Sequence, residues 1–154
     1  IVHINNKNEH KVFIAGNGGS ASIASHVSVD FLKAANVECM NFNEPNLITC
    51  FSNDYGYENW IKEALKIYAK TDDLLILISS SGESLNILNA AEKAKDMGMK
   101  LVTLSGFDSD NSLRKHGDIN LWVNSKNYNF VEMAHHIWLV SIVDFITEKK
   151  HEKK

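Results

Sequence analysis

The sequence predicts an α/β fold, a three-layer α/β/α sandwich around a central five-stranded parallel sheet. Short apolar runs of strand length alternate with longer amphipathic runs of helical length along the chain. Residues 74–78 form a continuous apolar run, as expected for a central parallel strand that is covered on both faces. Turns rich in glycine and serine follow two of the predicted strands and open the next helices. This order is typical of a doubly wound sheet with right-handed crossovers.

The chain begins with one strand, one helix and a second, short strand. Residues 12–15 are apolar and predict a buried strand, and residues 20–35 carry apolar side chains at helical spacing. Residues 38–42 predict the short second strand. Pro45, the only proline, is expected in the loop after it, and residues 47–51 are apolar and ambiguous.

The middle of the chain repeats the alternation of helix and strand. Residues 57–69 place their apolar side chains on one face, which favours a helix before the strand at residues 74–78. Residues 84–97 are amphipathic and end at Gly98, which predicts a helix with a glycine at its C-terminal end. Residues 100–104 predict the next strand.

A long helix follows the last predicted strand. Residues 108–116 predict a short helix, and residues 119–123 a further strand. Residues 130–148 predict a long helix that is apolar nearly all round. Such a helix must be buried, partly against another subunit, so we expect a homo-oligomer.

Length, composition and charge limit the class of protein. The 154 residues are 44% hydrophobic and 23% charged, which predicts one globular domain over residues 1–154. The net charge is −3 and Arg114 is the single arginine, so no basic surface is expected for a nucleic acid. No apolar run is expected to reach the length needed to span a bilayer, and the N-terminal residues are not expected to form a signal peptide. We therefore expect a cytoplasmic protein without a membrane or nucleic-acid partner.

Residues 16–20, Gly-Asn-Gly-Gly-Ser, form the turn between the first strand and the first helix. Glycines at a helix start let backbone N–H groups and the positive end of the helix dipole approach an anion. Gly16, Gly18 and Ala21 also satisfy the dinucleotide-binding fingerprint. That fingerprint requires an acidic residue at the end of the second strand, whereas Glu38 lies at its start. A tight turn without a ligand is the third interpretation.

Residues 79–84, Ser-Ser-Ser-Gly-Glu-Ser, form a second turn of this kind. One serine is enough to cap the following helix, whereas four hydroxyl groups within six residues can surround a phosphate with donors. The turn therefore favours a phosphomonoester over a dinucleotide, and it disfavours an NAD-dependent dehydrogenase. The sequence contains no Gly-x-x-x-x-Gly-Lys-Ser/Thr loop, so we expect no nucleotide cofactor.

Four segments carry a resemblance to a known family. They are residues 16–20 with His26 and Asp30 downstream, Asn-Asp-Tyr-Gly at 53–56, Ile-Ser-Ser-Ser-Gly-Glu-Ser at 78–84, and Gly-Met-Lys-Leu-Val-Thr-Leu-Ser-Gly at 98–106. Together they resemble the sugar isomerase (SIS) domain, and within it the phosphoheptose isomerases that act on sedoheptulose 7-phosphate. The resemblance implies a single SIS domain with a flavodoxin- or Rossmann-like sheet, with the N-terminal helix of the family missing from this sequence.

The resemblance also implies which residues bind the sugar phosphate. In the family, the first turn, an Asn-Asp pair and the serine-rich turn contact the ligand. The matching positions here are Asn17, Gly18, Gly19, Ser20, Asn53, Asp54, Ser79, Ser80, Ser81 and Ser84, with Glu132 on the final helix.

One zinc ion per subunit is a further implication of the resemblance. In the family, a His and a Glu one helical turn apart bind zinc, and the carboxylate also acts as a base; here these positions hold His26 and Asp30. The final helix of the family supplies a Gln or Glu ligand, here Glu132, and eight residues later a catalytic His, where this chain has Val140. His135 and His136, three and four residues after Glu132, share a face with it and are candidate substitutes, with His136 as the candidate ligand. A core or interface histidine is the alternative for that position.

The resemblance implies an aldose–ketose isomerase for a heptose phosphate, in lipopolysaccharide or capsule heptose biosynthesis. In this hypothesis Asp30 or Glu132 removes the proton at C2, His26 exchanges hydroxyl protons and the serine turn holds the phosphate. A metal held by His26, Asp30 and Glu132 would polarise the carbonyl. The alternative is a catalytically silent SIS module that binds a sugar phosphate or a protein partner, and the valine at Val140 favours it.

Overall fold

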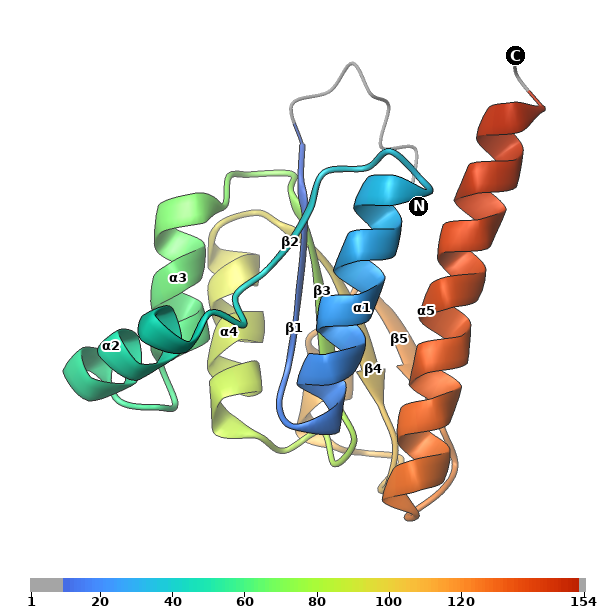
Figure 1. Ribbon diagram of the computed structural model, residues 1–154. Coiled ribbons are helices and arrows are strands. Elements are labelled where there is room, and N and C mark those ends of the chain that lie inside the picture. The colour runs from blue at the N-terminus through green and yellow to red at the C-terminus, as the bar shows by residue number, and fades with distance from the viewer. Residues whose placement is uncertain (1–9, 153–154) are drawn as a thin grey trace.

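A parallel sheet of five strands runs through the middle of the protein, with helices on both faces (Figure 1). The computed structural model describes residues 10–152, so the N-terminal residues expected to lack a signal peptide lie outside the described part. The predicted fold class and its five parallel strands are confirmed. The strands are β1 (Val12–Gly16), β2 (Cys39–Asn41), β3 (Leu74–Ser79), β4 (Lys100–Ser105) and β5 (Ile119–Trp122), in the spatial order β2-β1-β3-β4-β5.

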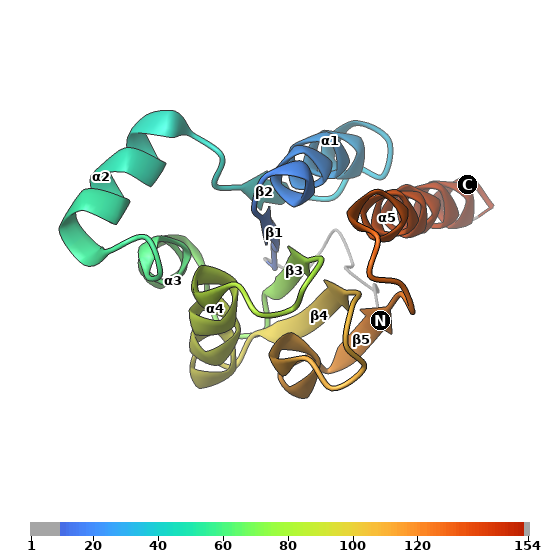
Figure 2. The ribbon, with the colours of Figure 1, turned by 90° about the horizontal axis from the view of Figure 1, so that it is seen from below.

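Two layers of helices bury the two faces of the sheet (Figure 2). Side chains alternate along each strand: in β1, Val12 and Ile14 belong to one apolar core, and Phe13 and Ala15 belong to the other. The first core lies under α1 (Gly19–Lys33) and α5 (Tyr128–His151). The second core lies under α2 (Pro45–Tyr55), α3 (Trp60–Tyr68) and α4 (Leu85–Asp96). A short 3-10 helix, η1 (Ser112–Lys115), precedes β5.

The helices lie close to their predicted positions, and the main error concerns Pro45. This residue was expected in a loop, but it is the first residue of α2, which also includes the ambiguous residues 47–51. Glu44 caps α2 by accepting a hydrogen bond from the backbone N–H of Leu47 at 2.7 Å. Proline is favoured at such a position because the first N–H groups of a helix have no partner within it. The predicted short helix at 108–116 shrinks to η1.

Helix α5 packs on the sheet through one face only. Val131 and Leu139 are buried in the core, whereas Phe130, Ile137 and Phe145 are 70%, 61% and 60% exposed. The expectation that the whole helix is buried is therefore not met within one chain. An exposed apolar stripe of this length is typical of a surface that contacts another protein.

By length and composition, α5 could also cross a membrane. Within residues 10–152 it is the one helix that meets both conditions, over Tyr128–Lys150, where an 18-residue window has a mean hydropathy of 1.3. The expectation that no apolar run reaches this length was therefore wrong. The core helix of a soluble protein can have the same properties, and α5 packs on the sheet through Leu139 and Val143, so this is weak evidence for a membrane.

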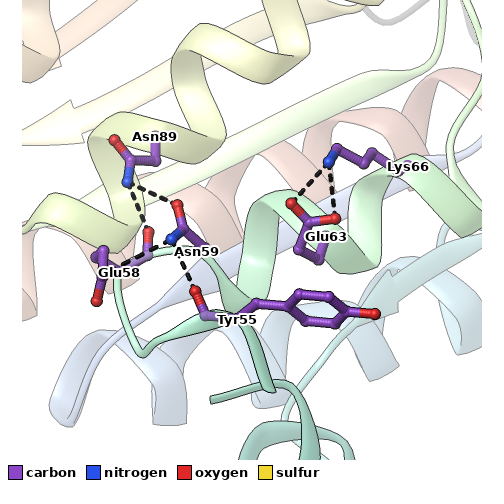
Figure 3. A network of polar contacts seen from close by, with 6 residues as sticks. All are labelled: Tyr55, Glu58, Asn59, Glu63, Lys66 and Asn89. Atoms are coloured by element: carbon purple, nitrogen blue, oxygen red, sulfur yellow. Dashed lines mark hydrogen bonds and ion pairs between the residues drawn. The ribbon is translucent and has the colours of Figure 1, made fainter. Parts of the chain in front are cut away.

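Polar contacts fasten the turn between α2 and α3 to helix α4 (Figure 3). Asn89 of α4 donates from Nδ2 to the backbone carbonyl of Glu58 at 2.8 Å and to Asn59 Oδ1 at 3.2 Å. Asn59 in turn donates to the carbonyl of Tyr55, the last residue of α2, at 2.8 Å. These bonds hold the turn, which includes Tyr57, beside α4.

Replacing Ile14 by Ala should lower the free energy of unfolding by about 2–5 kcal/mol, because the substitution leaves a cavity in the core. Ile14 in β1 is 0% exposed. The matched control is Ile67→Ala on α3, where the side chain is 69% exposed and the change should stay below about 0.5 kcal/mol. Urea unfolding measures both values. Equal losses for the two variants would contradict the central position of β1.

Candidate active site

The carboxyl ends of β1 and β3 meet at the edge of the sheet where the two polar turns come together. The chain runs from β1 to β2 on one side and from β3 to β4 on the other, and a crevice opens at such a switch point. Helices α1, α4 and α5 begin at this edge (Figure 1). A cavity of about 120 Å³ lies there, several times the space that a water molecule needs. It is lined by Asn17, Ser20, Ile78, Ser79, Ser80, Ser81, Ser84, Tyr128 and Glu132.

The serine turn after β3 forms one wall of this cavity. The backbone N–H of Gly82 donates to Ser79 Oγ, and that of Glu83 donates to Ser81 Oγ, both at 3.2 Å, so two hydroxyl groups are held in place. Ser80 differs, because its Oγ is buried and has no hydrogen-bond partner among the described residues. An unpaired hydroxyl is costly to bury, and Ser80 is among the residues that line the cavity, so a ligand oxygen there would give this hydroxyl a partner.

Helix N-termini supply the positive potential at the cavity. Gly18 precedes α1 with a φ of 54°, and Ser84 precedes α4; neither residue caps its helix with a side chain. The first N–H groups of both helices are therefore available to an anion. Among the described residues that line the cavity, none is a lysine or arginine. A phosphate there would be bound by N–H and O–H donors rather than by a cationic side chain.

Glu132 brings a carboxylate to the same cavity. It lies in the second turn of α5, and its carboxylate lies directly against Gly19, the first residue of α1. A Cβ at Gly19 would be 2.5 Å from Glu132 Oε2 and 2.6 Å from Oε1, so any other residue would displace the carboxylate. The structure thus brings the first turn, the serine turn and Glu132 together, as the motifs predict.

His26, Asp30 and His136 form a second polar cluster, between α1 and α5. His26 Nε2 lies 3.2 Å from Asp30 Oδ2, and His26 Nδ1 lies 2.8 Å from His136 Nε2. One proton is shared between the two facing ring nitrogens, so one of them donates and the other accepts. Gly19 and His26 are seven residues apart on α1, which places this cluster about 10 Å along the helix from the residue that Glu132 covers.

The four predicted zinc ligands are divided between the cavity, where Glu132 lies, and the second cluster, which contains His26, Asp30 and His136. Among residues 10–152, no group of three or more His, Cys, Asp or Glu side chains is arranged to hold a metal ion. A histidine ligand binds zinc through a free ring nitrogen, whereas both nitrogens of His26 have partners in Asp30 and His136. In this arrangement the residues of one chain do not fit the ion. Bound zinc stays a prediction, and no step below passes through it.

Other candidate residues lie outside the cavity lining. Asn53 and Asp54 are exposed on α2, where Asn53 Nδ2 donates to Asp54 Oδ1 at 2.9 Å, and their contact with substrate stays a prediction. His135 is fully buried, with Nε2 donating to the Ser105 carbonyl at 3.0 Å, and burial lowers its pKa. It is therefore a core histidine. Val140 packs against the core between the sheet and the α1 and α5 layer.

Two residues at this edge were not found from the sequence. Tyr128 lines the cavity, and its position one turn before Glu132 on the same helix is the signal that could have revealed it. Asn86 lies behind the cavity wall, where its amide contacts that of Asn17. No local pattern around Asn86 indicates this contact, because the two residues are far apart in the chain.

Replacing Ser80 by Ala should weaken the binding of inorganic phosphate about tenfold or more, because one donor to the anion is lost. Stability should be kept, since the hydroxyl has no partner. Ser52→Ala is the matched control, because Ser52 Oγ is also buried and unpartnered but lies on α2, outside the cavity. Titration calorimetry measures the affinities. If the Ser80→Ala protein binds phosphate as tightly as the unchanged protein, the serine turn is not the phosphate-binding site.

Comparisons with known proteins agree with the motifs. The SIS domain profile matches residues 2–106. The chain is 34% identical over 146 residues to the phosphoheptose isomerase of Helicobacter pylori strain HPAG1, covering 91% of this chain and 76% of the relative. It is 31% identical over 152 residues to that of Buchnera aphidicola subsp. Acyrthosiphon pisum strain Tuc7, covering 96% and 78%. The solved phosphoheptose isomerase from Francisella tularensis matches with a TM-score of 0.84 and 31% identity, covering 90% and 76%. The chain therefore belongs to the SIS domain family and, within it, to the phosphoheptose isomerases.

Proposed function

We propose that this protein isomerises a heptose phosphate, converting sedoheptulose 7-phosphate between its ketose and aldose forms. The observation that carries the proposal is that one cavity is lined by both the serine turn and Glu132. A phosphate site and a base in one cavity are what an aldose–ketose isomerase requires. The names of the relatives support a heptose as the sugar. The cytoplasmic supply of heptose for lipopolysaccharide or capsule is the setting that we propose for this reaction.

The serine turn and the helix N-termini bind the phosphate. Ser79, Ser80, Ser81 and Ser84 surround it with hydroxyl groups, and the uncapped N-terminus of α4 adds backbone N–H groups. The sugar extends from the phosphate toward the start of α1 and Glu132. Binding of the phosphate fixes the sugar in one orientation, which places the same carbon next to the base in each turnover.

Glu132 moves the proton between the two carbons. Its carboxylate removes the proton from the carbon next to the carbonyl, which gives an enediol, and returns it to the former carbonyl carbon. N–H groups at the start of α1, beside the carboxylate, stabilise negative charge on the enediol oxygen. Asp30, the other predicted base, is paired with His26 and does not line the cavity.

The paired histidines lie outside the cavity lining, so the hydroxyl protons of the enediol reach them through water. Glu132 and His136 lie one turn apart on the same face of α5. His136 is hydrogen-bonded to His26, and His26 to Asp30, so a proton taken from a sugar hydroxyl can be shared along this row. A catalytically silent module would bind the sugar phosphate without converting it, and the identity to phosphoheptose isomerases favours the enzyme.

The active protein is a homo-oligomer, a dimer or a tetramer, that buries the apolar stripe of α5. Phe130, Met133 and Ile137 lie on one helical face and are each more than half exposed in the single chain. Val29 and Leu32 of the adjacent helix α1 are 55% and 49% exposed. A second copy of this chain would remove these side chains from water.

Glu132→Gln should lower kcat for sedoheptulose 7-phosphate by about 10²–10⁴-fold, because the amide keeps the shape of the side chain but cannot accept the proton. Asp30→Asn is the comparison, because it tests the other predicted base in the same helix layer. A coupled assay measures turnover, and titration calorimetry measures binding of the same sugar phosphate. Each assay is run with and without added zinc.

The pair of variants decides which carboxylate is the base. Unchanged turnover in Glu132→Gln, with a large loss in Asp30→Asn, would reject Glu132 and restore Asp30 to that role. Tight binding without conversion by the unchanged protein, whether or not zinc is added, would reject the isomerase and leave the silent module.

Ile137→Glu should shift the protein toward the monomer, because it places a charge in the middle of the α5 stripe. Light scattering coupled to size-exclusion chromatography measures the mass. Ile67→Glu is the control, since Ile67 is 69% exposed on α3, on the other side of the sheet. If both variants keep the mass of the unchanged protein, the α5 stripe is not the subunit interface.

A further inference from the structure

Two asparagine side chains join the turns on either side of the cavity. Asn17 follows β1 and lines the cavity, whereas Asn86 lies in the first turn of α4, is 2% exposed and does not line it. Asn17 Nδ2 donates to Asn86 Oδ1 at 2.9 Å, and Asn86 Nδ2 donates to Asn17 Oδ1 at 2.8 Å. Each amide therefore fixes the orientation of the other.

A third residue completes the set of partners around Asn17. The hydroxyl group of Tyr57, in the turn between α2 and α3, donates to Asn17 Oδ1 at 3.2 Å. The oxygen of the Asn17 amide then accepts two hydrogen bonds, which uses both of its lone pairs, whereas the nitrogen has donated only one of its two hydrogens. The group that Asn17 still offers to a ligand is an N–H donor.

The two partners of Asn17 are themselves held by one helix. Asn86 belongs to α4, and Asn89, one turn further along α4, binds the backbone of Glu58 in the turn that carries Tyr57 (Figure 3). Both hydrogen bonds to Asn17 Oδ1 thus come from parts of the chain that are fastened to each other. This arrangement leaves the Asn17 amide little freedom to rotate.

We propose that Asn86 is a positioning residue for the isomerase: it holds the Asn17 amide so that its free N–H donates to an oxygen of the bound sugar phosphate. The proposal rests on the proposed function. Asn86 acts through Asn17 and does not touch the ligand. A fixed donor of this kind is worth more than a mobile one, because no free energy is spent on orienting it when the ligand binds.

A double-mutant cycle between Asn17 and Asn86 tests the proposal. Asn86→Ala alone should lower kcat/KM for sedoheptulose 7-phosphate about tenfold, the size of one lost hydrogen bond. In an Asn17→Ala protein the same change should lower it by less than about twofold, because the group that Asn86 orients is gone. The matched control is Glu92→Ala, an exposed residue on the same helix without a contact in this network, whose effect should be the same in both backgrounds.

Two further measurements cover the remaining outcomes. Tyr57→Phe removes one hydroxyl group from a half-exposed side chain. This change should lower kcat/KM a few-fold when Asn17 is present and leave it unchanged in the Asn17→Ala protein. Tyr57→Phe therefore serves as the test if Asn86→Ala fails to fold. Titration calorimetry follows the same cycle in the affinity for sedoheptulose 7-phosphate. Equal losses in both backgrounds overturn the positioning role. If the affinities show the coupling but the protein converts no substrate, the isomerase function is rejected and the positioning role stands. If the protein shows neither the coupling nor conversion, the isomerase function and the positioning role are both rejected.

Discussion

The pairing of β1 with β3 is the constraint on which the rest of the site depends. The two strands run parallel and in register, with Val12 opposite Leu74 and Gly16 opposite Ile78. The residues that follow, Asn17 and Ser79, must therefore emerge at the same level of the sheet edge. Because the chain then turns to opposite sides, the first turn and the serine turn face each other across a crevice. A register shift of one residue would separate the two turns and reverse the faces on which both apolar cores are built.

The site also requires that α5 lies close to the edge of the sheet at which β1 and β3 end. Two glycines permit this close approach. A Cβ at Gly19 would collide with the Glu132 carboxylate, and a Cβ at Gly106, after β4, would lie 2.6 Å from Val131 Cγ2. The neighbouring residues Val131 and Glu132 are thus held between the start of α1 and the end of β4. Since Val131 is fully buried, the packing of the core also sets the position of the carboxylate next to it. The Glu132 carboxylate and the core are therefore parts of one arrangement.

The sequence alone predicted what depends on local pattern and missed what depends on contacts between distant residues. The five strands could be predicted because each is a short apolar run, and the two turns because their glycines and serines follow such runs. The start of α2 was missed because Pro45 is favoured both in loops and at the first position of a helix, and the capping by Glu44 decides between them. Asn86 could not be found, because its partner Asn17 lies 69 residues away and only the fold brings the amides together. The same limit holds for His136, whose contact with His26 spans 110 residues.

The absence of a cationic side chain from the described cavity lining has a consequence for the chemistry. A lysine or arginine beside the serine turn would bind the phosphate, but it would also pair with Glu132, the carboxylate in the same cavity. An ion pair of that kind favours the charged carboxylate so strongly that it would become a weaker base. Hydroxyl groups and the N-terminus of α4 lessen this conflict, because they carry partial rather than full charges and are fixed by the backbone. In the proposed mechanism, the use of serines in place of cations would therefore let one small cavity bind a dianion and keep a carboxylate able to take up a proton.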